Sequence, residues 1–430
     1  MDDRTRAPER GPGPVPAPVP VSPAGWPSPA VAPEGPQRRT SPVELLWDLV
    51  FVFAITQVTT LLAVRPGWGR FGEAMLALAL VWWAWSAFVW AANAQAEDSG
   101  ALRAYLLAAT VLIFITGLAL PQAFGREGLL FAGAYTLVRL LHLAVYIDAS
   151  RRGSASAAAI AGFAATVVAG MALLLIGAVA LRGWPRAALW SVAAVIDYSG
   201  PAWLTRERLR GLQRVAVEHF AERYGLFVLI CLGESVVAIG LGVGSGQRRL
   251  GAAALLSAGL ALLTAVGMWW TYFDRLAAEA TRRLREHRDP VLAAADGYSY
   301  LHLVIVAGII VFAGGVKLVV HGAAGSPMPT TGRLALCGGV ALYSAGVAAF
   351  ALRLTGELTL GRPLLAVALL ALFALGGGIP AWTVAAGIAV LTLGLCVAES
   401  RAADPALWTV RAGPRIADQP PDGVSARPRS

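Results

Sequence analysis

Ionisable side chains inside long apolar segments are the residues of this sequence that could do chemistry. Glu234 is the clearest case, because Gly233-Glu234-Ser235 lies between the apolar stretches 226–232 and 236–239. A carboxylate in such surroundings must be protonated, paired with a cation or exposed to water. We interpret Glu234 as a candidate proton or cation site with Ser235 beside it. An interhelical hydrogen-bonding acid is the structural alternative.

Two more carboxylates, Glu44 and Asp48, stand four residues apart before the apolar run 49–55. This spacing places both on one face of a helix. Pro42 and an acidic first turn are also typical of an ordinary helix N-terminus. Glu44 therefore fits either interpretation, whereas Asp48, one turn deeper, is interpreted as functional.

Arg139 and His142 lie three residues apart and share a face of another predicted helix. An arginine at membrane depth requires a buried carboxylate partner, and Glu234, Asp48 and Asp197 are the available ones. The sequence leaves the choice among them open. His142 could titrate near neutral pH or serve as a structural hydrogen-bonding residue.

Other polar and aromatic groups have ordinary structural explanations. Lys317 lies near a predicted helix end and can extend its ammonium group to the interface. The tryptophans of the predicted helix 71–92 fit packing or an interfacial belt better than a ligand-stacking surface. Asn93, Glu97 and Asp98 at the end of that helix fit a salt-bridged cap.

The composition shows which elements must position these residues. Of 430 residues, 57% are hydrophobic and 14% charged, and the mean hydropathy is +0.63. Soluble chains run at about 45–50% apolar and about 25% charged. The composition excludes a disordered protein, a coiled coil and an ordinary cytosolic enzyme. It predicts an all-α polytopic transmembrane bundle, because lipid offers no partner for unpaired backbone groups.

Twelve apolar runs have the length that spans a bilayer, roughly 20 residues. They cover residues 43–64, 71–92, 102–121, 127–147, 155–181, 185–204, 223–243, 251–274, 297–320, 333–353, 362–377 and 380–398. The last two form one apolar stretch that is broken only by a predicted hairpin at Gly376-Gly-Gly-Ile-Pro380.

The aromatic segments Trp82-Trp83-Ala-Trp85 and Trp269-Trp270-Thr-Tyr272 are displaced by six predicted helices. An even displacement predicts two six-helix repeats of the same orientation, residues 43–204 and 223–398. Chance similarity between aromatic-rich helices explains this echo about as well as duplication does.

The net charge of +9 is mainly a topology signal. With a cytoplasmic N-terminus, 25 of the 35 basic residues fall on the inside, among them five each in the segments 206–223 and 275–288. We therefore expect both termini to lie on the cytoplasmic side of the membrane. The expected partners are the bilayer and a small-molecule or ion substrate, not nucleic acid. The oligomeric state is left open.

Both ends of the chain are expected to be disordered cytoplasmic tails. Residues 1–42 carry 12 of the 26 prolines and have no continuous apolar stretch of a signal peptide. Residues 401–430 are also proline-rich and charged. The transmembrane domain is thus predicted to cover 43–400.

Motifs of nucleotide, metal and hydrolytic chemistry are absent from the sequence. There is no phosphate loop, no HExxH and no GxSxG. Cys231, Cys337 and Cys396 lie in apolar runs without metal-ligand spacing. We expect no cofactor, no metal and no catalytic residue, and a non-enzyme is favoured over an enzyme.

Two segments, Val43–Gln57 and Glu222–Val236, resemble the signatures of the bacterial low temperature requirement A (LtrA) family. The first reads E-L-L-W-D-L-V-F-V-F from Glu44, and the second reads E-R-Y-G-L-F followed by L-G-E-S. The resemblance covers roughly residues 40–400 and implies a multi-helix membrane protein without an established substrate. The family's acidic string after the second helix is replaced here by Asn93-Ala-Gln-Ala-Glu97-Asp98, which puts a cation role for this corner in doubt.

Two functions of different classes follow. The leading hypothesis is an ion-coupled secondary transporter in which Glu234 holds the proton or cation, and Asp48 and Arg139 gate or pair with it. The alternative is a lipid-modifying or envelope-maintenance protein linked to growth at low temperature. Its polar cluster would be interfacial: Glu44, Asp48, Asn93, Glu97 and Asp98. A structural or sensory protein without turnover is a third hypothesis.

Overall fold

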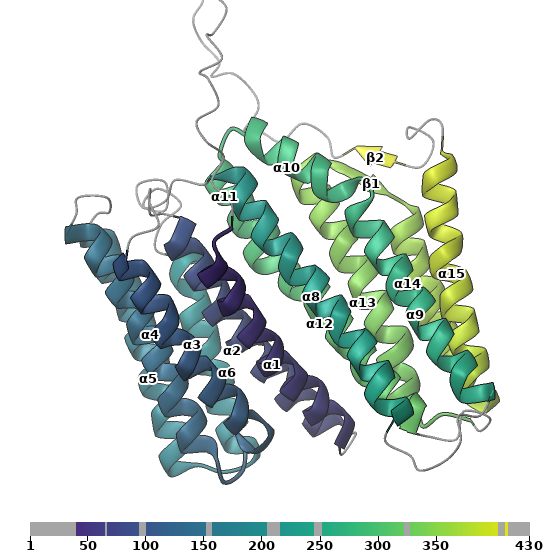
Figure 1. Cartoon of the computed structure of the whole chain (residues 1–430), viewed down its shortest axis with the longest axis horizontal. Coiled ribbons are helices and arrows are strands. Elements are labelled where there is room, and N and C mark those ends of the chain that lie inside the picture. Colours follow the sequence, from purple (N-terminus) through teal and green to yellow (C-terminus); the bar gives the residue numbers. More distant parts are fainter. Residues whose placement is uncertain are drawn as a thin grey trace, which may run out of the picture. The chain divides into compact units, whose positions relative to one another are not determined.

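The described part of the protein is almost entirely helical (Figure 1). The computed structural model describes residues 40–64, 67–93, 100–151, 157–203, 216–244, 252–321, 327–402 and 409–411. Most of the predicted N-terminal tail and most of the C-terminal tail lie outside these residues, as do Glu97 and Asp98.

Twelve helices of 15 residues or more lie within the described residues and correspond in order to the twelve predicted runs. They are α1 (Pro42–Val64), α2 (Trp68–Asn93), α3 (Gly100–Ala119), α4 (Gly128–Arg151), α5 (Ala157–Ala180), α6 (Trp184–Trp203), α8 (Val217–Gly244), α9 (Ala252–Phe273), α12 (His302–His321), α13 (Thr330–Thr355), α14 (Gly361–Leu375) and α15 (Ala381–Arg401).

Eleven described segments are long and apolar enough to cross a membrane, which confirms a polytopic helical bundle. The helix that falls short is α6, because it contains Arg186 and Asp197. Both are buried and bonded within the bundle. Arg186 donates to backbone oxygens around the end of α5, including that of Leu181, and Asp197 pairs with α4. Such internal pairing is how a polar helix is tolerated at membrane depth.

The structure corrects two predicted boundaries. α8 begins at Val217 and not at residue 223, so Arg223 lies inside a helix and not in a cytoplasmic loop. The span of α12 is preceded by α11 (Pro290–Ala294) and a π-helical turn η2 (Ala295–Leu301). The predicted hairpin is confirmed, because a 3₁₀ turn, η3 (Gly376–Gly378), separates α14 from α15.

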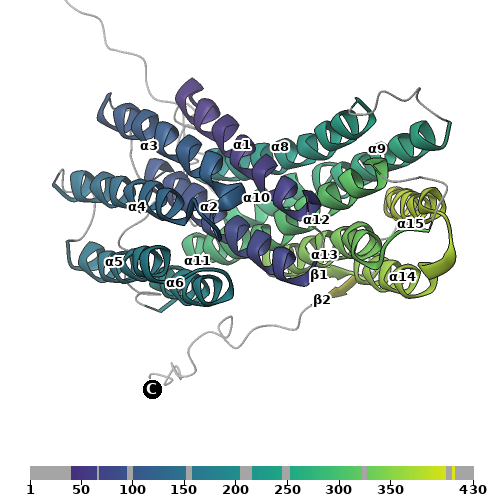
Figure 2. The same cartoon turned by 90° about the horizontal axis from the view of Figure 1, so that it is seen from below.

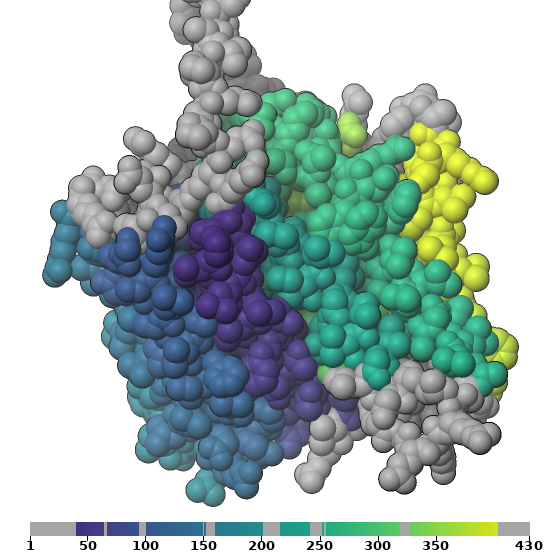
Figure 3. Space-filling model, viewed as in Figure 1, coloured from purple at the N-terminus to yellow at the C-terminus, as the bar shows by residue number. Residues whose placement is uncertain are grey.

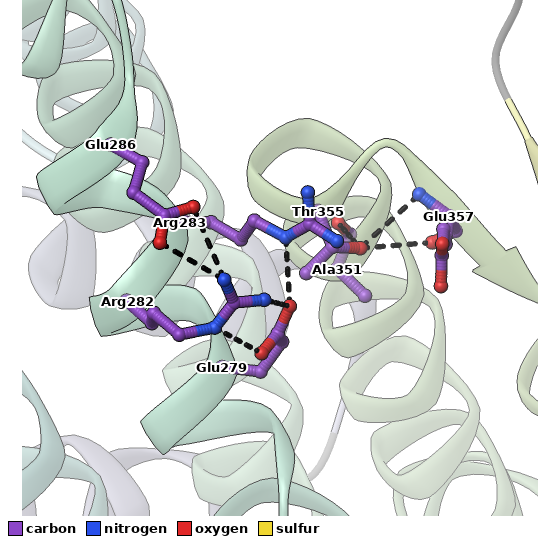
Figure 4. A network of polar contacts seen from close by, with 7 residues as sticks. All are labelled: Glu279, Arg282, Arg283, Glu286, Ala351, Thr355 and Glu357. Carbon is purple, nitrogen blue, oxygen red and sulfur yellow. Dashed lines mark hydrogen bonds and ion pairs between the residues drawn. The ribbon is translucent and has the colours of Figure 1, made fainter. Parts of the chain in front are cut away.

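A short amphipathic helix, α10 (Leu276–Glu286), follows α9. Its apolar residues are buried at positions four apart, whereas its charged residues form an ion-paired surface network (Figure 4). In this network Arg282 bonds both Glu279 and Glu286. Two strands, β1 (Glu357–Thr359) and β2 (Thr409–Arg411), pair antiparallel, and β1 contacts α13. β2 belongs to the segment expected to be a disordered tail.

Helices α1–α6 (the first half) and α8–α15 (the second half) pack internally in the same order. In the first half α1 contacts α3, α3 contacts α4, α4 contacts α5, and α5 contacts α6. In the second half α8 contacts α12, α12 contacts α13, α13 contacts α14, and α14 contacts α15. The contact of α2 with α6 likewise corresponds to that of α9 with α15. These pairings are those of two helical sets displaced by six helices.

The two halves meet through α1 and α2 on one side and α8 and α12 on the other. Figure 2 shows α3–α6 to one side of this central group and α9, α14 and α15 to the other. On the face seen in Figure 3, α1 (purple) separates the blue helices of the first half from the teal and green helices of the second. α1 therefore lies directly against α8 and α12 at the boundary between the halves.

Candidate functional site

Glu234 and Lys317 form a buried ion pair at the boundary between the halves. The Lys317 Nζ atom lies 2.9 Å from Glu234 Oε1, and the two side chains are 8% and 1% exposed. The carboxylate comes from α8 and the ammonium group from α12. An ion pair at this depth is costly to desolvate, so the remaining lone pairs of the carboxylate need hydrogen bonds.

Two threonines of α1 supply those hydrogen bonds from the other half. Thr56 Oγ1 lies 2.6 Å from Glu234 Oε2, and Thr59 Oγ1 lies 2.7 Å from Oε1. Lys317 Nζ also donates to Thr59 Oγ1 at 2.5 Å. Thr56 and Thr59 are three residues apart and so share a helix face. We call these four residues the carboxylate site.

Each threonine hydroxyl also has a backbone acceptor on its own helix. Thr56 Oγ1 lies 3.1 Å from the carbonyl oxygen of Val52, and Thr59 Oγ1 lies 2.9 Å from that of Thr56. A hydroxyl has one proton and two lone pairs. Either hydroxyl can therefore donate to the carboxylate, or turn to its backbone acceptor and accept a proton from Glu234.

A second buried cluster joins the start of α1 to α8. Arg223 lies 2.6 Å from Asp48 Oδ1 through one terminal nitrogen and 3.0 Å from Glu44 Oε1 through the other. His219 Nε2 lies 3.3 Å from Glu44 Oε2. These four side chains are at most 2% exposed. We call them the arginine cluster.

Neighbouring groups complete the arginine cluster. The indole nitrogen of Trp85 donates to Asp48 Oδ1 at 2.7 Å, and the backbone N–H of Ser41 donates to Glu44 Oε2 at 2.8 Å. His219 Nδ1 lies 3.5 Å from Asn93 Oδ1. The geometry fits both interpretations of Glu44. Its carboxylate caps the start of α1, and it also binds Arg223.

An apolar layer separates the two sites. Asp48 and Thr56 are eight residues apart, or about 12 Å along α1 at 1.5 Å per residue. Phe51 and Ile55 lie in this interval on α1, and Phe227 lies between Arg223 and Glu234 on α8; all three are at most 1% exposed. Buried apolar residues therefore lie between the two sites along both helices.

A third buried ion pair lies within the first half. Arg139 of α4 bonds Asp197 of α6 at 2.7 Å, and both are at most 1% exposed. Of the three carboxylates available from the sequence, the structure selects Asp197. Among the described residues the expected partnership of Arg139 with Glu234 or Asp48 is not formed, because Lys317 holds Glu234 and Arg223 holds Asp48.

This third site keeps polar atoms that have no hydrogen-bond partner among the described residues. They are Arg139 Nε and Nη1, Asp197 Oδ2 and both ring nitrogens of His142. The His142 ring lies between the rings of Phe88 and Phe163. Trp83 is the polar side chain next to Asp197, but its indole nitrogen also lacks a partner in this conformation.

A hydroxyl and indole network completes the contact between the halves. Ser299 Oγ, in the π-helical turn, accepts from Trp90 Nε1 at 2.7 Å and lies 3.1 Å from Ser86 Oγ. Tyr224 Oη bonds Ser86 at 2.7 Å, and Trp82 donates to the backbone oxygen of Ser299. This network agrees with a packing role for the tryptophans of α2.

The predicted site residues therefore separate into three groups. Glu44 and Asp48 lie together, Arg139 pairs with Asp197, and Glu234 stands in the carboxylate site. Ser235 is buried, but its hydroxyl has no hydrogen-bond partner among the described residues. His142 lies one turn from Arg139, and its ring packs against those of Phe88, Tyr146 and Phe163.

Sequence reasoning missed Thr56, Thr59, His219 and the pairing roles of Arg223 and Lys317. The spacing of His219 and Arg223, four residues apart, repeats that of Glu44 and Asp48 and could have indicated two facing pairs. Their role was hidden by the late predicted start of α8. Threonines in an apolar helix carry little signal of their own.

The arrangement suits proton or ion exchange better than metal binding. Each buried acid in these three sites has a cation as its partner. Within the described ranges no group of three or more His, Cys, Asp or Glu side chains could hold a metal ion. A change of protonation at any of these acids would leave its basic partner without a counter-ion in a low dielectric.

Comparison with known proteins agrees with the motifs at these sites. Residues 39–397 match the family model described as bacterial low temperature requirement A protein (LtrA). An uncharacterized protein of Rhizobium meliloti (strain 1021) is 32% identical over 280 residues, which is 64% of this chain and 68% of that relative. The matched range includes the arginine cluster, the carboxylate site and the Arg139–Asp197 pair. The chain therefore belongs to the bacterial low temperature requirement A family.

Proposed function

We propose that this protein is an ion-coupled secondary transporter of the bacterial cytoplasmic membrane, with Glu234 as the site of the coupling ion. The observation that carries the proposal is the carboxylate site. A buried acid there is held by hydroxyls of one half and by an ammonium group of the other. Ionisable residues in membrane spans mark substrate and ion pathways.

The place of the site between the halves supports the proposal. Secondary transporters are commonly built from two repeats, with the coupling site near the midplane at their interface. Movement of α1 against α8 and α12 would break the bonds of Thr56 and Thr59 to Glu234. A change in the protonation or ion occupancy of Glu234 would in turn alter the stability of this interface.

The arginine cluster supports a gate on the side where α1 begins. Its bonds join α1 directly to α8, and the apolar layer lies between it and Glu234. With the termini in the cytoplasm, as the positive charge predicts, this gate is the inner one. Asp48 then acts as a gating residue, whereas Arg139 stabilises the first half.

The test uses the full chain in proteoliposomes that contain a pH-sensitive dye. Inward gradients of Na⁺, K⁺, organic anions and organic amines are imposed in turn on the wild type and on Glu234→Gln. We expect at least one gradient to change the lumenal pH in the wild type and not in Glu234→Gln. Glu279→Gln, on exposed α10, is the matched control and should behave as the wild type.

Undiminished pH-coupled flux in Glu234→Gln would contradict the proposal, as would a wild type that responds to none of the gradients. The lipid-modifying alternative requires an acidic cluster that headgroups can reach. The burial of Glu44 and Asp48 supports transport instead, because both are bonded inside the bundle.

A further inference from the structure

We infer that the cargo is a small organic anion that travels with a proton, the proton on Glu234 and the anionic group on Lys317. This inference rests on the proposed transport function and specifies its coupling ion and substrate class. It is carried by the hydrogen bonds of the carboxylate site, by its charge balance and by a small apolar pocket lined by neighbours of Lys317 on α12.

The coupling ion is a proton because the site can satisfy both forms of Glu234. In the ionised form Thr56, Thr59 and Lys317 all donate to the carboxylate. In the protonated form a threonine hydroxyl turns to its backbone acceptor, the oxygen of Val52 or Thr56, and accepts from the acid. A Na⁺ ion would have to replace the ammonium group that now lies 2.9 Å from the carboxylate.

The charge balance then calls for an anion. The resting pair of Glu234 carboxylate and Lys317 ammonium is neutral. Protonation of Glu234 leaves this pair at +1, because the acid no longer offsets the charge of Lys317. One monovalent anion restores neutrality, and a net charge at this depth is costly. A proton and an anion therefore bind together, and each is released when the other leaves.

The direction of approach agrees with an anion of apolar body. A small pocket lies between the halves at the end of the bundle where α1 ends and α2 begins. Its lining is mainly apolar: Leu62, Trp68, Phe71, Gly314, Leu318 and Leu334. Gly314 lies one turn before Lys317, and Leu318 follows it directly. Lys317 is also the more exposed partner of the pair, at 8% against 1% for Glu234.

The charged surroundings are simple enough for the exchange. Among the described residues the charged group that bonds Glu234 is Lys317 from α12, and the buried Cys231 thiol lies one turn earlier on α8. The adjacent face of α1 contributes the two threonine hydroxyls. Within the described residues, Lys317 is therefore the cation at this site to which an anion can bind.

The experiment uses pyruvate and 4-methyl-2-oxopentanoate as probes, because both stay ionised at neutral pH and differ in apolar bulk. The full chain in dye-loaded proteoliposomes is given an inward gradient of each anion, and the lumenal pH is followed. Exchange of radiolabelled anion across vesicles loaded with the same unlabelled anion is measured in parallel. The variants are Glu234→Gln and the double variant Glu234→Gln with Lys317→Met, which leaves no unpaired charge.

We expect the wild type to acidify the lumen and to exchange labelled anion. Glu234→Gln imitates the protonated acid, so it should exchange anion at a rate within about threefold of the wild type while acidification falls at least tenfold. The double variant should lose both. If Na⁺ or amine gradients drive Glu234-dependent pH changes and neither anion does, the proposed transport function stands and the anion inference is overturned. Loss of exchange in Glu234→Gln also overturns it, as does its retention in the double variant.

Discussion

At the scale of single residues, burial distinguishes the ion pairs of this protein. On α10, Arg282 and Glu279 are 50% and 36% exposed, and pairs of this kind contribute little to stability. Arg223 is 1% exposed and holds two carboxylates that water does not reach. Removal of such a buried partner leaves the opposite charge uncompensated, which costs far more than the pair itself contributed.

We predict that Arg223→Met lowers the stability by about 3–5 kcal/mol, because Glu44 and Asp48 are then buried without their cation. The measurement is thermal unfolding of the detergent-purified chain, followed by size-exclusion chromatography. Arg282→Met, which removes a cation of the α10 surface network, is the control and should leave the unfolding temperature unchanged. Equal unfolding temperatures for the two variants would contradict the assignment of the arginine cluster.

The Arg139–Asp197 pair gives a second prediction. Asp197→Asn should destabilise the protein by about 3–5 kcal/mol, because the guanidinium group stays buried without its charge partner. The double variant Arg139→Met with Asp197→Leu should recover most of this loss, since replacement of a whole buried pair by apolar groups is often neutral. A thermodynamic cycle of the wild type, Arg139→Met, Asp197→Leu and the double variant measures the coupling, and simple additivity of the two changes would refute it.

At the scale of helices, close backbone contact explains the firm packing of α12 on α13. A Cβ atom on Gly308 would lie 2.4 Å from the backbone nitrogen of Tyr343, and one on Gly339 would lie 2.5 Å from that of Phe312. Small residues permit such approach in membrane helices. This contact fixes α12 and with it the position of Lys317.

Gly308→Ala should therefore force α12 and α13 apart and reduce the yield of folded, monodisperse protein several-fold. Gly394→Ala on α15 is the matched control, because a Cβ there meets nothing within 4 Å. Fluorescence-detected size exclusion of the two variants gives the readout. A normal profile for Gly308→Ala would show that the two helices are not in close contact.

At the scale of the whole molecule, the positive charge predicts cytoplasmic termini. A green fluorescent protein fused after Ser430 should fluoresce, and an alkaline phosphatase fused at the same position should be inactive. The same two reporters inserted after Gly125, between α3 and α4, should behave in the opposite way. Active phosphatase at the C-terminus would invert the topology and move the proposed inner gate to the outside.

The sequence by itself determined the class of fold, the order of the twelve long helices and the burial of Asp48, Arg139 and Glu234. These are local properties, because bilayer length and the cost of a charge in lipid act on each segment separately. The predicted start of α8, residue 223, is six residues late. Glu218, His219 and Glu222 interrupt the apolar pattern before that residue, although tertiary contacts stabilise this segment as a helix.

Only the tertiary structure decided the partners of those charges. Glu44 and His219 are 175 residues apart, and Thr56 and Glu234 are 178 residues apart. Hydropathy and periodicity describe one helix at a time. They therefore allow three acids as the partner of Arg139, and they indicate no partner for Lys317. The packing of α4 near α6, and of α1 against α8 and α12, selects Asp197 for Arg139 and Glu234 for Lys317. Within the membrane the choice is enforced because a buried charge that misses its partner has no water to replace it.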